Sequence, residues 1–508
     1  MYKKEKENNT DYMEWLHEKV LQWIYKNRFT KKHFILMVST IALMFCICTP
    51  SFSQSVKYKE ELAKLEHKYN EILLNLHASD KSEKDYLKAN KSMLKLAENG
   101  YNPAMRFLGT YYYNKKDFEQ YENWYVKAAE NGDSIAQFEL GNNYYDGTGL
   151  NKDYSKAVYW FEKAAEQGNA LSQYDLGICY KNGKGVKQNY AKAAYWFEKA
   201  AEQGYENAQY ILGISYNYGK GVKQDYAKAA YWFEKAAEQG FDKAQNSLGI
   251  CYYKGQGVEK DFFKAAFWYT KAAEQGQTDA QYNLGVCYYK GQGVEKDFSK
   301  AEFWYTKAAE QGDAQAQYNL GICYTKGQGV EKNFSKAEFW YTKAAEQGLA
   351  QAQYALAVFY DNIQQDVEQD YTKAVFWYTK AAEQGLAQAQ YNLGLCYTKG
   401  QGIKQDYTKA AFWYIKAAEQ GLAQAQGKLG VCYYKGEGVE QNYKEAAYWS
   451  KKAAEQGNSL SQYNLGFFYY HGLGVEQDIS KAVYWITKAA EQGDADAQHF
   501  LNELNSKK

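Results

Sequence analysis

The chain has few prolines, few histidines and almost no net charge. Only Pro50 and Pro103 occur among its 508 residues, and Ala, Lys and Glu are abundant, which favours helices over nearly the whole length. No histidine lies between His77 and His471, so most of the chain lacks the commonest general base and metal ligand. With 61 basic and 60 acidic residues, the chain has no excess charge for binding nucleic acid. We therefore expect a helical protein without metal, cofactor or nucleic-acid partner.

Long apolar runs are also absent, apart from one near the N-terminus at residues 34–48. Basic residues precede this run and small residues follow it, an order typical of a signal peptide cleaved before Gln54. The run is shorter than the roughly 20 residues of a membrane span. The sequence predicts a basic cytoplasmic region at 1–33, a signal peptide or short anchor at 34–53, and export to the periplasm, the cell surface or the medium. Because the region before the run is long for a signal peptide, an uncleaved anchor at 34–48 and a cytoplasmic protein remain alternatives.

From residue 133 onward the sequence repeats every 36 residues. The letters AEQG close each copy, at Gly168, Gly204, Gly240, Gly276, Gly312, Gly348, Gly385, Gly421, Gly457 and Gly493. The step from Gly348 to Gly385 is one residue longer, because DNIQQDVEQD replaces the usual glycine loop, and we expect a local change of curvature there. The predicted organisation is a helical cap or stalk at 54–100, a degenerate repeat at 101–132, ten complete repeats at 133–493, and a capping helix with a polar tail at 494–508.

The copy at residues 313–348 shows the internal pattern. Apolar or small residues around Leu320 lie on one face of a helix, and KGQGV then predicts a turn. Asn333 is a plausible N-cap for a second amphipathic helix, which Gly348 ends. Each copy is therefore predicted to be a helix–turn–helix hairpin. Since one hairpin cannot bury both apolar faces, neighbouring copies must stack.

Two features recur in nearly every copy. A Leu-Gly pair, Leu320-Gly321 in this one, removes a side chain where two helices can approach closely. A tryptophan, Trp340 in this one, recurs on the second helix, and we assign it to the core between helices.

The pattern A-x3-LG-x2-Y-x2-G-x-GV-x2-D-x2-KA-x2-W-x2-KAA-x-QG resembles the Sel-one-like repeat (SLR), a relative of the tetratricopeptide repeat. The resemblance covers the ten complete copies. It implies an all-α fold, a right-handed α/α solenoid of stacked helix–turn–helix repeats. It also implies a scaffold or adaptor that binds proteins or peptides, in bacteria often in envelope assembly, periplasmic signalling or host contact. We expect a monomeric array.

The face of the first helix opposite Leu320 is the candidate binding surface. At 100° per residue, Tyr318 lies about 160° from Leu320, and Ile322 lies about 200° from it. In tetratricopeptide-like solenoids this face lines the concave groove. The resemblance therefore assigns partner binding to the tyrosines at this position, Tyr174, Tyr210, Tyr282, Tyr318, Tyr354, Tyr391 and Tyr463. An aliphatic row at the Ile322 position runs beside them. Whether the winding of the chain itself covers these rows, or a partner does, stays open at this point.

Six cysteines share one position of the repeat: Cys179, Cys251, Cys287, Cys323, Cys396 and Cys432. Neighbouring helices are about 8–10 Å apart, whereas a disulfide needs Cα atoms closer than about 7 Å. We expect buried free thiols.

Two other functions remain as alternatives to a scaffold. Ser92 and Lys95 match the S-x-x-K pattern of enzymes that act on β-lactams or peptidoglycan, but the companion motifs S-D-N and K-T-G are absent. We therefore predict no enzymatic activity. The tyrosines could instead bind carbohydrate as a surface array.

Overall fold

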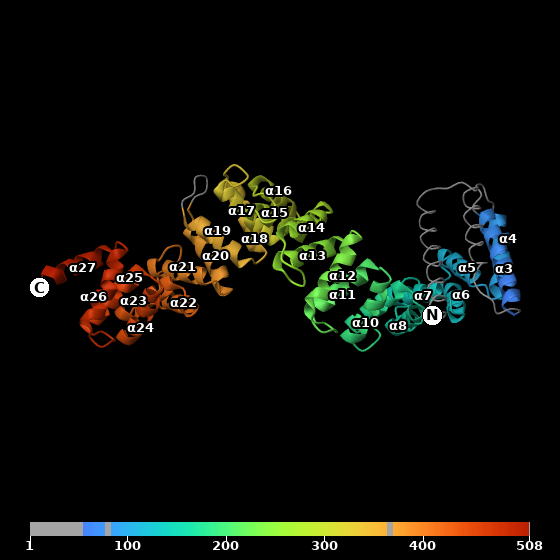
Figure 1. The fold of residues 1–508 in the computed structure, drawn as a ribbon, viewed down its shortest axis with the longest axis horizontal. Coiled ribbons are helices and arrows are strands. Elements are labelled where there is room, and N and C mark those ends of the chain that lie inside the picture. Colours follow the sequence, from blue (N-terminus) through green and yellow to red (C-terminus); the bar gives the residue numbers. More distant parts are fainter. Residues whose placement is uncertain (1–53, 77–82, 363–368, 507–508) are drawn as a thin grey trace. The chain divides into compact units, whose positions relative to one another are not determined.

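All regular structure that the computed structural model describes is α-helical (Figure 1). The described residues are 54–76, 83–362 and 369–506. The predicted signal or anchor at 34–53 lies outside them, as do residues 363–368 of the irregular repeat. Among the helices of the described ranges, none combines the length and the apolar character that a membrane span requires.

The helices alternate between two types that pair into hairpins. Two N-terminal helices come first, α3 (Gln54–Leu76) and α4 (Glu83–Glu98). The first helices of the hairpins are α5 (Asn102–Asn114), α7 (Ser134–Asp146), α9 (Ala170–Asn182), α11 (Glu206–Tyr218), α13 (Asp242–Lys254), α15 (Thr278–Lys290), α17 (Ala314–Lys326), α19 (Ala350–Asp361), α21 (Ala387–Lys399), α23 (Ala423–Lys435) and α25 (Ser459–His471). The second helices are α6 (Phe118–Glu130), α8 (Tyr154–Glu166), α10 (Tyr190–Glu202), α12 (Tyr226–Glu238), α14 (Phe262–Glu274), α16 (Phe298–Glu310), α18 (Phe334–Glu346), α20 (Tyr371–Glu383), α22 (Tyr407–Glu419), α24 (Tyr443–Glu455) and α26 (Ile479–Glu491). The last helix, α27 (Ala495–Ser506), is again of the first type. The predicted all-α architecture of stacked hairpins is confirmed.

The chain forms two compact units, and the boundary between them falls within α13. One unit extends to Ala244 and includes Gln256–Val258, and the other contains Gln245–Gly255 and the residues from Glu259 onward. Within a unit, successive helices pack against each other, as α17 does with α16 and with α18. Packing between nearest neighbours is the defining property of a solenoid.

The repeat at residues 313–348 shows how the sequence sets the helix ends. α17 stops where Gly327 adopts φ 69°, the left-handed region that glycine enters at little cost. The side-chain oxygen of Asn333 accepts a hydrogen bond from the backbone N–H of Lys336 at 2.9 Å and caps α18. Gly348, with φ 90°, follows the end of α18. The predicted turn, N-cap and stop are confirmed.

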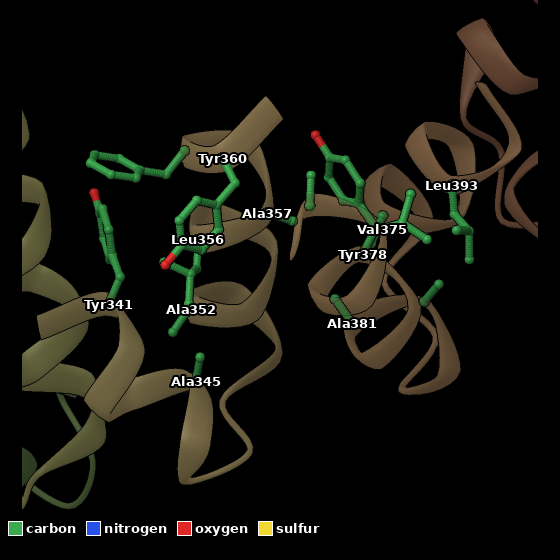
Figure 2. Close-up of a cluster of buried hydrophobic side chains, with 14 of the residues drawn as sticks. Tyr341, Ala345, Ala352, Leu356, Ala357, Tyr360, Val375, Tyr378, Ala381 and Leu393 are labelled. Carbon is green, nitrogen blue, oxygen red and sulfur yellow. The ribbon is translucent and has the colours of Figure 1, made fainter. Parts of the chain in front are cut away.

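The Leu-Gly pair lies where the two helices of the repeat approach closely. Leu320 is fully buried, and a Cβ built on Gly321 would lie 2.5 Å from Cδ1 of Tyr341 on α18. No real Cβ comes so close to another carbon, so glycine lets the Tyr341 ring lie against the first helix in its present position. The same ring also contributes to the next interface, where Figure 2 shows it beside Ala352 and Leu356 of α19.

The tryptophan of the second helix lies at the edge of the core rather than inside it. Trp160 is buried, but the other nine tryptophans of this ladder, such as Trp340, are only half-buried. The enclosed position is the next one along the chain, held by Tyr341 in this repeat. Our assignment of the tryptophans to the core is therefore wrong for most copies. The reason is geometric, because Gly321 leaves its space opposite the residue that follows the tryptophan.

The irregular repeat keeps both helices but ends the first one differently. α19 is followed by Asn362, whose backbone is extended (φ −111°, ψ 148°) instead of left-handed. Ala357 stands where the other complete repeats have glycine, and it is fully buried. The carboxylate of Asp370 caps α20 in the usual way. The missing glycines therefore alter the connection and leave both helices intact. The change of curvature at this repeat stays a prediction.

Candidate partner-binding groove

The seven predicted groove tyrosines are all half-buried, and each lies against another aromatic ring. Six of them contact the ring that follows the tryptophan in their own repeat, as Tyr318 contacts Tyr341 with ring centroids 6.0 Å apart. In five of these repeats that ring faces the glycine, and in the irregular one it belongs to Tyr378 and the glycine is replaced by Ala357. Tyr463 instead contacts Phe500 of α27, at 6.5 Å, because Ile486 occupies that place in its repeat. Every predicted tyrosine is thus held at an equivalent point of the repeat, with part of its side chain accessible.

Partial burial also sets the chemistry of these side chains. Burial raises the pKa of Tyr282, Tyr318 and Tyr391 above the ordinary value of a phenol. Their hydroxyl groups therefore stay protonated at physiological pH, and each can donate a hydrogen bond as well as accept one.

Between α15 and α17 the surface is hollowed to a volume of about 240 Å³. The hollow is lined by Tyr282, Val286, Tyr289, Lys290, Tyr305, Asn319 and Ile322. It joins one predicted tyrosine to two members of the predicted aliphatic row, from two adjacent repeats. Drug-sized ligands occupy about 300–1,000 Å³, so a hollow of this size suits individual side chains of a longer ligand.

The irregular repeat adds a polar cluster that sequence reasoning missed. The hydroxyl of Tyr378 donates to the carboxylate of Asp361 at 3.1 Å, and the amide of Asn392 donates to the same hydroxyl at 3.1 Å. Thr325 and Thr398 stand at the equivalent position in the repeats before and after, so Asp361 places a negative charge where neighbouring repeats are neutral. In the sequence, the only sign of this difference is that DNIQQDVEQD replaces the usual glycine loop.

The groove positions of the first unit carry more acidic side chains. Burial, and then the nearby charge of Asp146, raise the pKa of Asp175 to about 7. Burial also raises the pKa of Glu139, although the positive charge of Arg106 opposes that shift. Arg106 itself lies 3.2 Å from the carboxylate of Asp133.

All six repeat cysteines are buried and free, as predicted. Burial raises the pKa of Cys323 to about 12 and that of Cys432 to about 11, well above the usual value of a thiol. Thiols in this state are poor nucleophiles. Among the described residues, no group of three or more His, Cys, Asp or Glu side chains is placed to hold a metal ion.

Sequence reasoning also missed a row of exposed rings on the second helices. The residue before each tryptophan of the ladder is Tyr or Phe, and 52% of the Phe339 surface is accessible. Its ring meets Trp340 edge-on at 4.9 Å, and the ammonium of Lys343 lies 5.8 Å from its centroid. We call these residues the outer aromatic row: Tyr159, Tyr195, Tyr231, Phe267, Phe303, Phe339, Phe376, Phe412, Tyr448 and Tyr484. A helical wheel centred on the buried alanines would have placed them on the outside.

The S-x-x-K residues lie on α4. The hydroxyl of Ser92 donates to the backbone carbonyl of Lys88 at 3.1 Å, and Lys95 is exposed one turn further along. Neither residue lies on the groove face of a repeat.

Comparison with known proteins shows which family has this repeat. The family model of the Sel1 repeat matches eleven consecutive segments, the first at 102–133 and the last at 459–494. Among crystal structures, c5321, described as a protective antigen present in uropathogenic Escherichia coli strains, is 39% identical, with 82% of this chain and 90% of that chain covered and a TM-score of 0.72. A Sel1 repeat protein from Oxalobacter formigenes is 34% identical, with 61% and 89% covered and a TM-score of 0.51.

A comparison with curated proteins found no match. Apart from residue 206, the matched segments cover the chain from α5 to the end of α26, and they include the irregular repeat at 350–386. The degenerate copy, which lacks the glycine loop, is matched as a repeat as well. Sel1-repeat proteins are in general non-enzymatic scaffolds for protein interaction. The chain belongs to the Sel1-repeat family, whose Sel-one-like pattern the sequence alone had suggested.

Proposed function

We propose that the chain is an exported scaffold that binds a protein or peptide partner along the groove face of its first helices. The observation that carries this proposal is the hollow between α15 and α17, where Tyr282 and Val286 of one repeat meet Ile322 of the next. An accessible site that spans two repeats suits a ligand that runs along the array. The general role of Sel1-repeat proteins in protein interaction supports the same function.

The chemistry of the tyrosine row suits such a ligand. A tyrosine offers a large apolar ring at low cost in side-chain entropy, and its hydroxyl adds a hydrogen bond. Packing against the second-helix rings holds the groove tyrosines in place before a partner arrives, as Tyr318 is held by Tyr341. Little ordering is then needed on binding, which favours affinity.

The test of the groove is a crosslinking pull-down from the native cell envelope with the full chain. One variant carries Tyr→Ala at Tyr282, Tyr318 and Tyr354. A matched control carries Phe→Ala at Phe303, Phe339 and Phe376, in the outer aromatic row of the same three repeats. Circular dichroism and thermal unfolding verify that both variants remain folded.

We expect a protein captured by the native chain and by the outer-row variant to be lost in the tyrosine variant. Loss in the outer-row variant with retention in the tyrosine variant would move the binding face to the second helices. Equal capture by all three chains would contradict a role for the groove tyrosines.

Export is the second part of the proposal, and it rests on the apolar run at 34–48 with its basic and small flanking residues. A C-terminal epitope tag followed through cell fractionation tests it. We expect the tag in the periplasm, at the cell surface or in the medium, with the new N-terminus at Gln54 if the signal is cleaved. A full-length chain found only in the cytoplasm would rule export out.

Carbohydrate binding is a second candidate function, and the outer aromatic row favours it. About half of the surface of each of its rings is accessible, for example 53% for Tyr159 and 51% for Phe412. A row of exposed rings that continues from repeat to repeat can mark a binding surface. Sugar-dependent quenching of tryptophan fluorescence would be seen with the native chain and lost in the Phe303, Phe339 and Phe376 variant, because Trp340 lies in edge contact with Phe339.

A further inference from the structure

We propose that the groove of the second unit binds an extended polypeptide segment rich in aspartate and glutamate. This inference rests on the proposed scaffold function and adds the chemistry of the partner. It follows from a row of lysines at the rim of the groove, from the charges that are missing around them, and from the shape of the hollow.

The lysines occupy one position, the last residue of the first helix. Lys326 holds it in the repeat at 313–348, directly before the loop glycine. In the second unit the row consists of Lys254, Lys290, Lys326, Lys399 and Lys435. The irregular repeat has Asn362 there instead, and the last repeat has His471. In the first unit no copy has lysine at this position, which is filled by Asn114, Asp146, Asn182 and Tyr218. The lysine row is therefore a property of the second unit.

The lysine row lies next to the aliphatic row of the groove. Each lysine follows a member of the aliphatic row by four residues, as Lys290 follows Val286, and residues four apart lie on the same side of a helix. Lys290 and Val286 line the hollow together with Ile322 of the next repeat. An apolar contact and a cationic group are thus available to one ligand at one place.

Four of the five lysines of the row have no carboxylate partner within the described residues. Within the described residues, Lys254, Lys290, Lys326 and Lys399 form no ion pair, and Lys435 only approaches Glu437 of its own loop at 3.7 Å. On the second helices, four lysines pair with the N-cap aspartate of their own helix, as Lys300 does with Asp297 at 3.8 Å. Others there, such as Lys343, form no ion pair among the described residues, but they lie away from the groove.

Carboxylates are also rare along the tyrosine, aliphatic and lysine rows of this unit, although Asp313, the N-cap of α17, lies near Tyr282 and Asp279 lies near Asp313. Lys428 adds a further positive charge at the position next to the tyrosine row. Asp361 is the one acidic side chain at the equivalent positions of Tyr318, Asn319, Ile322, Thr325 and Lys326 between residues 245 and 457, and Tyr378 already donates a hydrogen bond to it. A partner with the opposite charge would supply the missing carboxylates.

The geometry favours an extended segment over a compact ligand. Neighbouring helices pack about 8–10 Å apart, which corresponds to about three residues of an extended chain at roughly 3.3 Å each. One acidic side chain in three could then reach each lysine, while an apolar side chain enters the hollow beside Ile322. The amide of Asn319, which also lines the hollow, can hydrogen-bond to the backbone of such a segment.

Fluorescence anisotropy with three labelled peptides tests the proposal on the full chain. The peptides have about 20 residues, long enough to span several repeats, and are built from Asp-Leu-Ser, Asn-Leu-Ser or Lys-Leu-Ser units. The groove variant carries Lys→Glu at Lys290, Lys326 and Lys399. Its matched control carries Lys→Glu at Lys307, Lys343 and Lys416, on the exposed side of the second helices of the same unit. Both variants change the net charge equally.

We expect the aspartate peptide to bind the native chain and the outer-lysine variant, and to bind the groove variant at least about tenfold more weakly. The native affinity should fall as salt is added. Equal affinity for the aspartate and asparagine peptides, or equal losses in the two variants, would overturn the proposal. If the aspartate peptide does not bind while the envelope partner is still captured through the tyrosines, only the acidic assignment fails. If neither binds, the groove function fails as well.

Discussion

The side chain of Gln347 donates a hydrogen bond from Nε2 to Oε1 of Gln317, 2.8 Å away, and this pair fastens one repeat to the repeat before it. Gln317 is buried and donates in turn to the carbonyl of Ala309 at 3.1 Å, while Gln347 also donates to the carbonyl of Gly312 at 2.9 Å. Both carbonyls belong to the end of the preceding repeat, so the two glutamines link their own repeat to it. The described chain holds ten such pairs, Gln137–Gln167, Gln173–Gln203, Gln209–Gln239, Gln245–Gln275, Gln281–Gln311, Gln317–Gln347, Gln353–Gln384, Gln390–Gln420, Gln426–Gln456 and Gln462–Gln492.

Replacing Gln317 by leucine should destabilise the array at this junction. The change removes two hydrogen bonds of the buried Gln317 side chain, worth together about 1–3 kcal/mol. The exposed amide of Gln347 keeps the carbonyl of Gly312 as an acceptor. Urea unfolding of the full chain measures the loss. Gln315→Leu is the control, because Gln315 lies on the same helix but is exposed. Equal stability of the two variants would show that the glutamine pair does not hold the repeats together.

Two glycines of the same repeat should respond differently to alanine. Gly329 and Gly348 both have positive φ, 78° and 90°, so each substitution costs roughly 1–2 kcal/mol of backbone strain. A Cβ at Gly329 would also lie 2.0 Å from the carbonyl oxygen of Phe298 in the preceding repeat, whereas a Cβ at Gly348 meets nothing within 4 Å. We therefore expect Gly329→Ala to cost about 1–3 kcal/mol more than Gly348→Ala in denaturant unfolding. Similar losses would mean that the loop moves away from Phe298 without cost.

Features that depend on neighbours in sequence could be predicted from the sequence. Gly327 and Asn333 mark a turn and a cap by their own backbone and side-chain preferences. The Leu320-Gly321 pair predicts a close approach because glycine has no side chain, whichever residue fills the space. The burial of Cys323 follows from its place on the face that contains Leu320.

Features that depend on pairing between distant residues were missed or misplaced. Trp340 and Tyr341 are both large aromatic residues, and Tyr341 is the enclosed one because it faces the space that Gly321 leaves on the other helix. Gln317 looked like an ordinary polar residue, since its partners lie 8 and 30 residues away along the chain. The groove tyrosines were placed on a face by periodicity, but the hollow that joins Tyr282 to the next repeat depends on how two hairpins stack.

The stability of the first unit should depend on pH through Asp175. Folded Asp175 keeps its proton up to about pH 7, whereas an unfolded aspartate releases it near pH 4. Between these values the folded state binds more protons than the unfolded state, so stability falls as pH rises through this window. Asp175→Asn should flatten that decline in urea unfolding.

Asp146→Asn supplies an internal comparison for the same measurement. Burial is the larger cause of the raised Asp175 pKa, and the Asp146 charge is the smaller one. Removing that charge should therefore reduce the pH dependence only in part. A decline that is as steep in Asp175→Asn as in the native chain would show that another group is responsible.

The six repeat thiols should resist alkylation while the chain is folded. With pKa values near 11 or 12, as for Cys432 and Cys323, fewer than about one thiol in a thousand is ionised at pH 8. Ser335→Cys provides the positive control, because Ser335 is exposed in the same repeat as Cys323. After a pulse of iodoacetamide, mass spectrometry of the peptides should find the introduced thiol modified and the six native ones unmodified. Full labelling should require urea.

The same labelling at intermediate urea concentrations shows which repeats of the array open first. Repeats in a solenoid are held by their immediate neighbours, so segments near an end open at lower free energy than internal ones. Cys432 lies closer to the C-terminal end of its unit than Cys323 does, and we expect Cys432 to be labelled at the lower urea concentration. Simultaneous labelling of both thiols would show that the second unit unfolds as one cooperative block. Rapid labelling of Cys323 without urea would contradict its burial.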